Sequence, residues 1–283
     1  MTAKFRLSAF GDEISADLAE QLQTLIGLNV HGLDLRGAWG KNVAKMDDED
    51  VARVKRICGE TGVKIACLGS PVGKSPLAEP ANFELGNLTR LMAIGKTLGT
   101  PLIRIFSFYP PDLSNNSVYD TYVPAAGERL AELARLAEIE GFVLVLENEK
   151  GIIGDTPERC LALVQAVNSP ALRFAWDPAN FVQVGVEKPI ERGWAGLKKF
   201  IGYVHIKDAL FADGKVTPAG EGDGQVRELL VNLKAMNYQG TLALEPHLKI
   251  AGHSSGFSGA EGMTIAVTAL RKLMAETGCE EVG

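Results

Sequence analysis

Residues 142–180 contain the unit that decides the fold, and they read FVLVLENEKGIIGDTPERCLALVQAVNSPALRFAWDPAN. The apolar runs Phe142–Leu146 and Leu172–Trp176 are short and rich in Val, Leu and Phe, which is typical of strands covered on both faces. Between them, Pro157–Val167 has the spacing of an amphipathic helix, and Asp155-Thr156-Pro157 offers a cap and a proline for its first turn. This stretch therefore predicts a strand, a helix and a second, parallel strand.

The same alternation continues along the whole chain. The other runs that we expect to form strands are Phe5–Phe10, Gly32–Leu35, Val63–Leu68, Pro101–Phe106, Gly202–Ile206 and Thr241–Leu244. The other segments with helical spacing are Asp17–Leu28, Asp48–Thr61, Asn82–Leu98, Tyr119–Glu140, Ile190–Phe200, Gln225–Met236 and Ser258–Glu276. Eight strands and eight helices in alternation predict an α/β protein made of a single (β/α)8 TIM barrel. We expect one domain over residues 1–283, with a polar C-terminal tail, 277–283, that frays.

An open, doubly wound sheet is the alternative architecture. Such a sheet with a nucleotide site usually carries GxGxxG after its first strand, whereas this chain has Gly11-Asp12-Glu13-Ile14-Ser15 there. The net charge of −6, from 35 acidic and 29 basic residues, opposes nucleic-acid binding. The N-terminus lacks a signal-peptide pattern, no run is apolar enough to cross a membrane, and the four cysteines are scattered. We expect a cytoplasmic protein without disulfides or membrane contact.

Four polar side chains follow or end four successive predicted strands. Glu147, Asp177, His205 and Glu245 are 30, 28 and 40 residues apart, about one strand–helix unit each. In a barrel they would meet at the C-terminal rim, where TIM barrels place their chemistry. Three carboxylates packed together repel one another, and a divalent cation removes that repulsion. Three oxygen donors and one imidazole favour Mn²⁺ or Mg²⁺, with Co²⁺ or Zn²⁺ as further candidates. The alternative is that each residue only bonds a neighbouring helix N-terminus.

At these residues the chain resembles the xylose-isomerase-like barrels, the sugar-phosphate isomerase/epimerase group. The segments that carry the resemblance are Leu146-Glu147-Asn148-Glu149, Trp176-Asp177-Pro178-Ala179-Asn180, Val204-His205-Ile206-Lys207-Asp208 and Leu244-Glu245-Pro246. The resemblance covers nearly the whole chain and implies one divalent metal held by Glu147, Asp177, His205 and Glu245. In the epimerases of this group the two glutamates also act as acid and base on opposite faces of the substrate. Two positions depart from the group: Asn180 stands where many members have histidine, and Asp34 where glutamate is frequent.

Further side chains near the strand ends are candidates for the site. Those that we expect to bind substrate are Arg36, Lys74, Arg104, Glu149, Lys207 and His247. Those that we expect behind the metal ligands are Asn180, Asp208 and Glu221, the last as an acceptor for His205. Arg36, Lys74 and Arg104 together would suit a phosphate or carboxylate. The alternatives are ion pairs of these cations with Asp12, Glu13 and Asp34, and a salt bridge from Lys207 that orients a carboxylate.

The predicted function is a metal-dependent sugar or sugar-phosphate isomerase or epimerase. It would remove a proton next to a carbonyl through an enediolate, with Glu147 and Glu245 as the acid/base pair. The main alternative is a metal-dependent dehydratase of a cyclic polyol ketone or a dehydroshikimate-like acid, which begins with the same proton removal. A DNA-repair endonuclease on this fold is disfavoured by the four histidines and the acidic charge. A non-catalytic metal-binding protein is a further alternative, and a homo-oligomer is possible for any of them.

Overall fold

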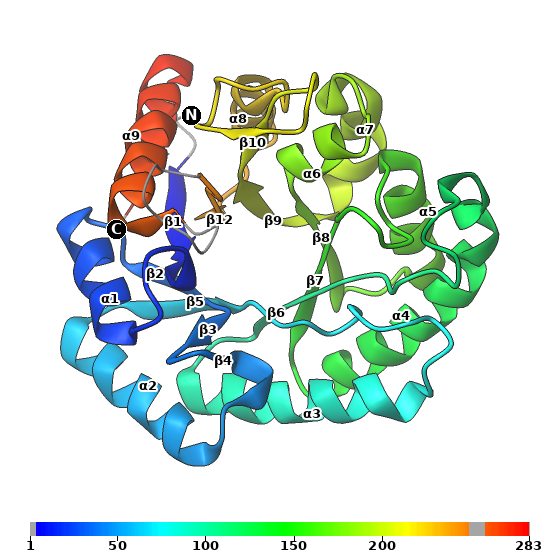
Figure 1. Ribbon diagram of the computed structural model, residues 1–283, viewed down its shortest axis with the longest axis horizontal. Coiled ribbons are helices and arrows are strands. Elements are labelled where there is room, and N and C mark those ends of the chain that lie inside the picture. The colour runs from blue at the N-terminus through cyan, green and yellow to red at the C-terminus, as the bar shows by residue number, and fades with distance from the viewer. Residues whose placement is uncertain (1–3, 249–257, 283) are drawn as a thin grey trace.

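The computed structural model describes residues 4–248 and 258–282. Eight parallel strands surround a central axis in Figure 1. Their bounds are β1 Lys4–Phe10, β2 Gly32–Leu35, β5 Lys64–Leu68, β6 Leu102–Ile105, β7 Val143–Glu147, β8 Leu172–Trp176, β9 Ile201–Ile206 and β12 Thr241–Leu244. Each strand pairs with the next in chain order, and β12 pairs with β1, which closes the sheet. This closure confirms the predicted (β/α)8 barrel and excludes an open sheet.

The helices form the outer layer, as Figure 1 shows. They are α1 Leu18–Gly27, α2 Asp48–Thr61, α3 Ala81–Leu98, α4 Val123–Ile139, α5 Pro157–Val167, α6 Pro178–Gln183, α7 Pro189–Leu197, α8 Val226–Ala235 and α9 Gly259–Thr277. Short 3-10 segments lie at Gly11–Glu13, Val43–Lys45, Asn116–Tyr122 and Lys198–Phe200. The apolar faces of the longer helices pack on the outside of the strands, and charged residues cover their other faces.

The structure differs from the predicted elements in its short segments. The helix predicted from Tyr119 begins at Val123, because Pro124 occupies its first turn and a 3-10 segment precedes it. The sequence did not predict helix α6, which has only 6 residues. It also did not predict two small antiparallel ribbons, β3 (Gly37–Ala38) with β4 (Lys41–Asn42) and β10 (Asp208–Ala209) with β11 (Val216–Thr217). Segments this short carry too few residues to show a periodicity.

The C-terminal tail, which we predicted to fray, has backbone and ion-pair partners in the described residues 277–282. After α9, the strand β13 (Glu280–Glu281) pairs in parallel with the start of β1, and Val282 N donates a hydrogen bond to Phe5 O. Glu281 also forms an ion pair with Arg271, whose Nη1 donates to Leu28 O. The polar composition of the tail suggested solvent exposure, but its charges and backbone groups have partners on α9 and β1.

The barrel interior has an apolar layer directly beneath its C-terminal rim. Its members come from six strands and are Phe10, Cys67, Val145, Ala175, Tyr203 and Ala243. Glu147, Asp177, His205 and Glu245 lie two positions beyond members of this layer on the same strands, so they share its face and the layer is the floor of the polar site described below. All four cysteines are buried free thiols. Among the described residues, no helix is long and apolar enough to span a membrane.

Candidate metal and catalytic site

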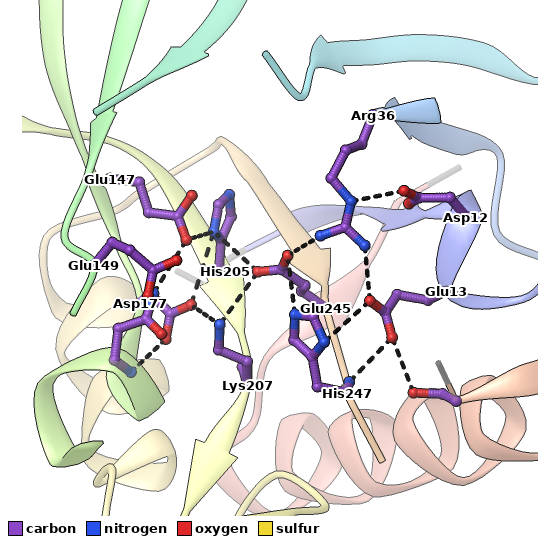
Figure 2. A network of polar contacts seen from close by, with 12 residues as sticks. Asp12, Glu13, Arg36, Glu147, Glu149, Asp177, His205, Lys207, Glu245 and His247 are labelled. Carbon is purple, nitrogen blue, oxygen red and sulfur yellow. Dashed lines mark hydrogen bonds and ion pairs between the residues drawn. The ribbon is translucent and has the colours of Figure 1, made fainter. Parts of the chain in front are cut away.

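The four strand-end residues predicted to bind a metal come together at the rim. Glu147 ends β7, Asp177 follows β8, His205 lies in β9 and Glu245 follows β12. One potential ligand atom from each lies within 4.8 Å of those of the others, and all four residues are at most 3% exposed. Figure 2 shows their side chains pointing toward one another. We call these four residues the rim cluster.

Local hydrogen bonds fix the direction of two of the carboxylates. Asp177 is the N-cap of α6, and its Oδ1 accepts from Asn180 N at 2.9 Å, which leaves Oδ2 facing the rim cluster. The sequence Asp-Pro-Ala-Asn therefore places the carboxylate and starts the helix at once. The Asn180 side chain donates to Glu147 Oε1 at 3.2 Å and to Asn148 O. Asn180 thus contacts Glu147 from behind the rim cluster.

The donor atoms of the rim cluster fit a divalent cation. Both ring nitrogens of His205 lack a hydrogen-bond partner among the described residues, although Nδ1 lies 3.1 Å from Glu147 Oε1 and 3.8 Å from Glu245 Oε2. A buried imidazole nitrogen that faces carboxylate oxygens without a hydrogen bond needs a partner. Three carboxylates and one imidazole are the donor set that Mn²⁺ and Mg²⁺ accept. Glu147, Asp177, His205 and Glu245 would hold the ion.

The carboxyl groups of the rim cluster have different electrostatic surroundings. Burial alone would raise the pKa of Glu147, but His205 and Arg104 outweigh it and hold that pKa at about 2. Burial raises the pKa of Asp177 to about 6, although Lys207 opposes this. Lys207, His247 and Arg36 hold the pKa of Glu245 well below its usual range against the effect of burial. The two glutamates are therefore carboxylates at neutral pH, as a metal ligand or a base must be.

Arg36 links the rim cluster to Asp12 and Glu13, two of the acids that the sequence offered as ion-pair partners for the basic residues. Its guanidinium donates to Asp12 at 2.7 Å, to Glu13 at 2.8 Å and to Glu245 at 2.5 Å. His247 lies between Glu13 and Glu245, with ring nitrogens 3.2 and 3.3 Å from their oxygens. Figure 2 shows this chain of contacts. Glu13, Glu245 and His247 also resemble a metal site, but Arg36 already supplies the positive charge between the two glutamates.

Lys207 lies inside the rim cluster. Its ammonium nitrogen is 2.8 Å from Asp177 Oδ2 and 3.4 Å from Glu245 Oε2, and the residue is 6% exposed. This is the salt bridge that the sequence left as an alternative to substrate binding. The side chain also lines a cavity of about 580 Å³ with Glu149, Lys150, Gln183 and His247. A second cavity of about 620 Å³ lies over β1 and β2, lined by Asp12, Ile14, Arg36, Ala38 and His247.

Each of the three cations predicted to form an anion site has a carboxylate partner. Arg36 pairs with three acids, Arg104 with Glu147 at 3.1 Å and Lys74 with Glu149 at 3.1 Å. The ion-pair alternative therefore describes this structure better, although Asp34 is not one of the partners. Asp34 lies inside the barrel and accepts from Tyr203 Oη at 2.7 Å.

Two residues predicted to lie behind the metal ligands have other positions. Glu221 is exposed in the loop after β11, and neither ring nitrogen of the buried His205 bonds it. Asp208 accepts backbone hydrogen bonds from Ala209, Gly220, Gly222 and Gly224. In this structure Asp208 therefore bonds the backbone of the loop that follows β11, and Glu221 does not contact the rim cluster.

Sequence reasoning missed some residues of the site. Phe10 ends β1 and Asn148 follows Glu147, whereas Glu13, which follows β1, was named only as an ion-pair partner. The Asn148 amide donates to Asp177 O and accepts from Asp177 N, which joins the ends of β7 and β8. The rule that found the rim cluster would have found Glu13, since it also follows a strand. No pattern in the sequence indicated that Phe10 lies against the two arginines.

The family assignment rests on a match that covers most of the chain. The sequence model described as "Xylose isomerase-like TIM barrel" matches residues 25–273. The chain belongs to this family. A protein of Methanocaldococcus jannaschii, named "Uncharacterized protein MJ1311", is 26% identical over 151 residues. That match covers 52% of this chain, and the chain spans about half, 51%, of that relative.

Solved structures with the same fold cover nearly the whole chain. A D-tagatose 3-epimerase-like protein has a TM-score of 0.74 and 18% identity, over 96% of this chain and 98% of that one. The probable 3-DHS dehydratase AsbF of Bacillus anthracis has a TM-score of 0.71 and 16% identity, over 95% and 98%. A xylose isomerase-like TIM barrel protein of Mycobacterium smegmatis, in complex with magnesium, has a TM-score of 0.68 and 17% identity, over 96% and 98%. At these identities the likeness concerns the fold.

Proposed function

We propose that this protein is a divalent-metal-dependent isomerase or epimerase that moves a proton next to the carbonyl of a sugar or sugar phosphate. The observation that carries the proposal is the rim cluster, in which two buried glutamates flank Asp177 and His205 at the catalytic end of the barrel. The epimerase-like neighbour supports the choice of reaction class. Mn²⁺ or Mg²⁺ is the proposed cofactor, with Co²⁺ or Zn²⁺ as further candidates.

The proposed roles follow from where each side chain stands. The cation supplies Lewis-acid stabilisation of the negative charge that develops at the substrate carbonyl. Glu147 and Glu245 come from strands that are separated by β8 and β9, so they reach a bound substrate from two sides. One removes the proton next to the carbonyl, and the other returns a proton on the opposite face or the neighbouring carbon. Asp177 and His205 act as ligands only.

Lys207 and His247 border the substrate side of the site. Both line the cavity of about 580 Å³, and both contact Glu245 through a nitrogen. We propose that they donate hydrogen bonds to substrate oxygens while they keep Glu245 in its ionised form. Lys150 and Gln183 line the same cavity and would contact more distant hydroxyls or a phosphate.

Hydrogen exchange with solvent tests the proposal whichever product the reaction forms. The protein is incubated in D₂O with Mn²⁺ and with D-fructose, D-tagatose, D-psicose, an inosose or dehydroshikimate, and loss of the C–H signal next to the carbonyl is followed by NMR. We expect exchange with at least one ketose, its loss on adding chelator, and at least about 100-fold slower exchange in Glu147→Gln and in Glu245→Gln. Glu158→Gln on the outer helix α5 is the control.

Three results would count against this assignment. Exchange that survives removal of all divalent metal would contradict metal dependence. Exchange that is unchanged in both glutamine variants would contradict the acid/base pair. Formation of a dehydrated product from the inosose or from dehydroshikimate, without exchange of any ketose, would favour the dehydratase alternative. That alternative has one supporting observation, the dehydratase among the structural neighbours.

A further inference from the structure

Phe10 occupies a central position among the charged residues of the rim. It ends β1, is fully buried and belongs to the apolar floor of the site. The guanidinium carbon of Arg36 lies 4.9 Å from its ring centre and that of Arg104 lies 5.3 Å away. The His205 ring meets the same ring at 90°, with centres 5.2 Å apart. One aromatic side chain therefore contacts a candidate metal ligand and two arginines.

Each of these arginines bonds one of the two glutamates. Arg36 Nη1 donates to Glu245 Oε1, and Arg104 Nη1 donates to Glu147 Oε2. The other oxygen of each glutamate faces His205 Nδ1, Glu147 Oε1 at 3.1 Å and Glu245 Oε2 at 3.8 Å. Both glutamates thus have one oxygen on a guanidinium and one oxygen toward the centre of the rim cluster.

We propose that Phe10 is a positioning residue, which orders Arg36, and Arg104 together with Phe106 at 4.6 Å, so that each glutamate turns a single oxygen toward the centre of the rim cluster. A guanidinium near an aromatic ring is attracted by the ring's electrons, and this attraction is strongest where water is excluded. A long side chain held in this way has fewer conformations, so the hydrogen bond at its end is more directional. The inference assigns Arg36 and Arg104 to the glutamates instead of to a substrate anion, and it rests on the proposed function only in requiring that the rim cluster binds a metal.

Gly69 gives independent support for a close fit between the ring and Arg36. A Cβ atom added at Gly69 would lie 3.0 Å from Phe10 Cε1 and 2.9 Å from Arg36 Cβ. Contacts this short force one of the two groups to move. Because Gly69, directly after β5, has no side chain, Arg36 can pass close to the Phe10 ring at this point. This close approach offers a second way to disturb the contact without changing any charge.

The test measures the affinity of the full-length chain for Mn²⁺ by titration calorimetry, after chelator has removed bound metal. Phe10→Leu removes the ring but keeps the charges of Arg36 and Arg104. A change in Mn²⁺ affinity would therefore come from a change in the positions of these arginines and of the glutamates that they bond. We expect about tenfold weaker Mn²⁺ binding, the usual size of effect for residues behind metal ligands. Gly69→Ala is expected to weaken binding in the same direction.

Phe108→Leu is the matched control. Phe108 is also fully buried, and Arg129 lies over its ring at 5.4 Å, but the described contacts of that pair do not include the rim cluster. We expect its Mn²⁺ affinity to stay within about twofold of the unmodified protein. A double-mutant cycle of Phe10→Leu with Arg104→Met adds a readout that general loosening of the core would not give. The loss of Mn²⁺ affinity caused by Phe10→Leu is expected to be at least about threefold smaller in the Arg104→Met variant than in the unmodified protein.

The outcomes separate the two proposals. If the unmodified chain binds no Mn²⁺, the proposed function fails, and the positioning role fails with it. If the unmodified chain binds Mn²⁺ and Phe10→Leu binds it as tightly, the positioning role alone is overturned. Equal losses in Phe10→Leu and Phe108→Leu, or a cycle that is fully additive, would also overturn it. Should Phe10→Leu not fold, unchanged affinity in Gly69→Ala would decide against the inference.

Discussion

Asp34 is a carboxyl group in the interior of the barrel, and it forms no ion pair with the described residues. It is 1% exposed, and the Tyr203 hydroxyl donates to its oxygens at 2.7 and 3.0 Å. Burial raises its pKa to about 6, with hydrogen bonds from Ser8 and Tyr203 opposing the shift. A pKa above the ordinary value of 3.8 means that the folded protein holds the proton over a range where the unfolded chain has released it.

This shift predicts a pH dependence of stability. Since the folded pKa is raised, the contribution of Asp34 is most favourable below about pH 4 and is lost as the pH rises to about 6, by about 3 kcal/mol. Asp34→Asn lacks the titrating group. We expect the metal-free wild type to lose about that much free energy of unfolding relative to the variant between pH 4 and pH 7, measured by urea denaturation. Parallel pH profiles for the two proteins would contradict it.

The sequence allowed the individual residues of the rim cluster to be predicted, but not the basic residues that form ion pairs with them. A charged residue at the end of an apolar run marks a position on the rim, and that rule found Glu147, Asp177 and Glu245. It says nothing about which cation each carboxylate meets. Arg36 and Glu245 are 209 positions apart, and their contact exists only because β12 closes against β1. Ion pairs that depend on barrel closure carry no local sequence signal.

At the scale of the elements, the loop that follows β11 is held in place by the side chain of Asp208. Asp208 accepts four backbone hydrogen bonds, from Ala209 and from three glycines of the loop that follows β11. Gly222 and Gly224 approach it so closely that a Cβ atom would lie 2.4 and 2.7 Å from Asp208 Oδ1. The Pro-Ala-Gly-Glu-Gly-Asp segment is therefore a structural loop built around one buried carboxylate.

Removing that carboxylate is expected to destabilise the protein strongly. In Asp208→Ala the backbone N–H groups lose their acceptor in a largely buried place, at a cost of about 2–4 kcal/mol in the free energy of unfolding. Asp208→Asn keeps one acceptor oxygen, so we expect a smaller loss. Guanidinium denaturation measures both, and Asp213→Asn, at an exposed position between β10 and β11, serves as the control. A loss below about 0.5 kcal/mol in Asp208→Ala would show that the carboxylate does not hold the loop.

The strand β13 makes a prediction for the C-terminal segment. Cys279 is 7% exposed, Glu281 pairs with Arg271, and Val282 N donates to Phe5 O. Deleting residues 279–283 removes these contacts and the pairing of Lys4 and Phe5, at the start of β1, with β13. We expect the free energy of unfolding to fall by about 1–3 kcal/mol, as followed by circular dichroism in urea. A truncated chain as stable as the full one would instead support the fraying that the polar composition suggested.

The long elements were predictable because their patterns are strong. The predicted bounds of Gly32–Leu35, Asp48–Thr61, Pro157–Val167, Leu172–Trp176 and Thr241–Leu244 are the bounds in the structure. The two helices have a helical period with a cap at the start, and the three strands are apolar runs that end at a charged residue. The two small ribbons and α6 were not predicted because their sequences are too short to show a periodicity. Contacts with the surrounding barrel determine their conformation instead. The pairing of the tail was not predicted because a two-residue strand needs only a short partner segment, which the start of β1 provides.

At the scale of the whole molecule, the closed barrel brings together acids that would otherwise repel one another. The four residues of the rim cluster are buried, and their charges are balanced in part by Arg36, Arg104 and Lys207. A divalent cation would complete this balance. Since such an ion binds the closed barrel and not the unfolded chain, its binding energy adds to the stability of the fold.

We therefore expect Mn²⁺ to raise the melting temperature. At about 100 times the dissociation constant, binding adds about 2.7 kcal/mol, which corresponds to a rise of about 5 °C for a chain of this size. Glu245→Gln is expected to abolish most of the rise, whereas Glu158→Gln is expected to keep it. Differential scanning calorimetry of chelator-treated protein with and without Mn²⁺ makes the comparison. An equal rise in Glu245→Gln would place the ion elsewhere.

The location of the ion tests the central claim most directly. A crystal of the protein grown with Mn²⁺ and measured at the manganese absorption edge shows each bound ion as a peak in the anomalous difference map. We expect one peak per chain, in contact with oxygens of Glu147, Asp177 and Glu245 and with a ring nitrogen of His205. The absence of a peak there, or a peak between Glu13 and His247 instead, would contradict the assignment of this site.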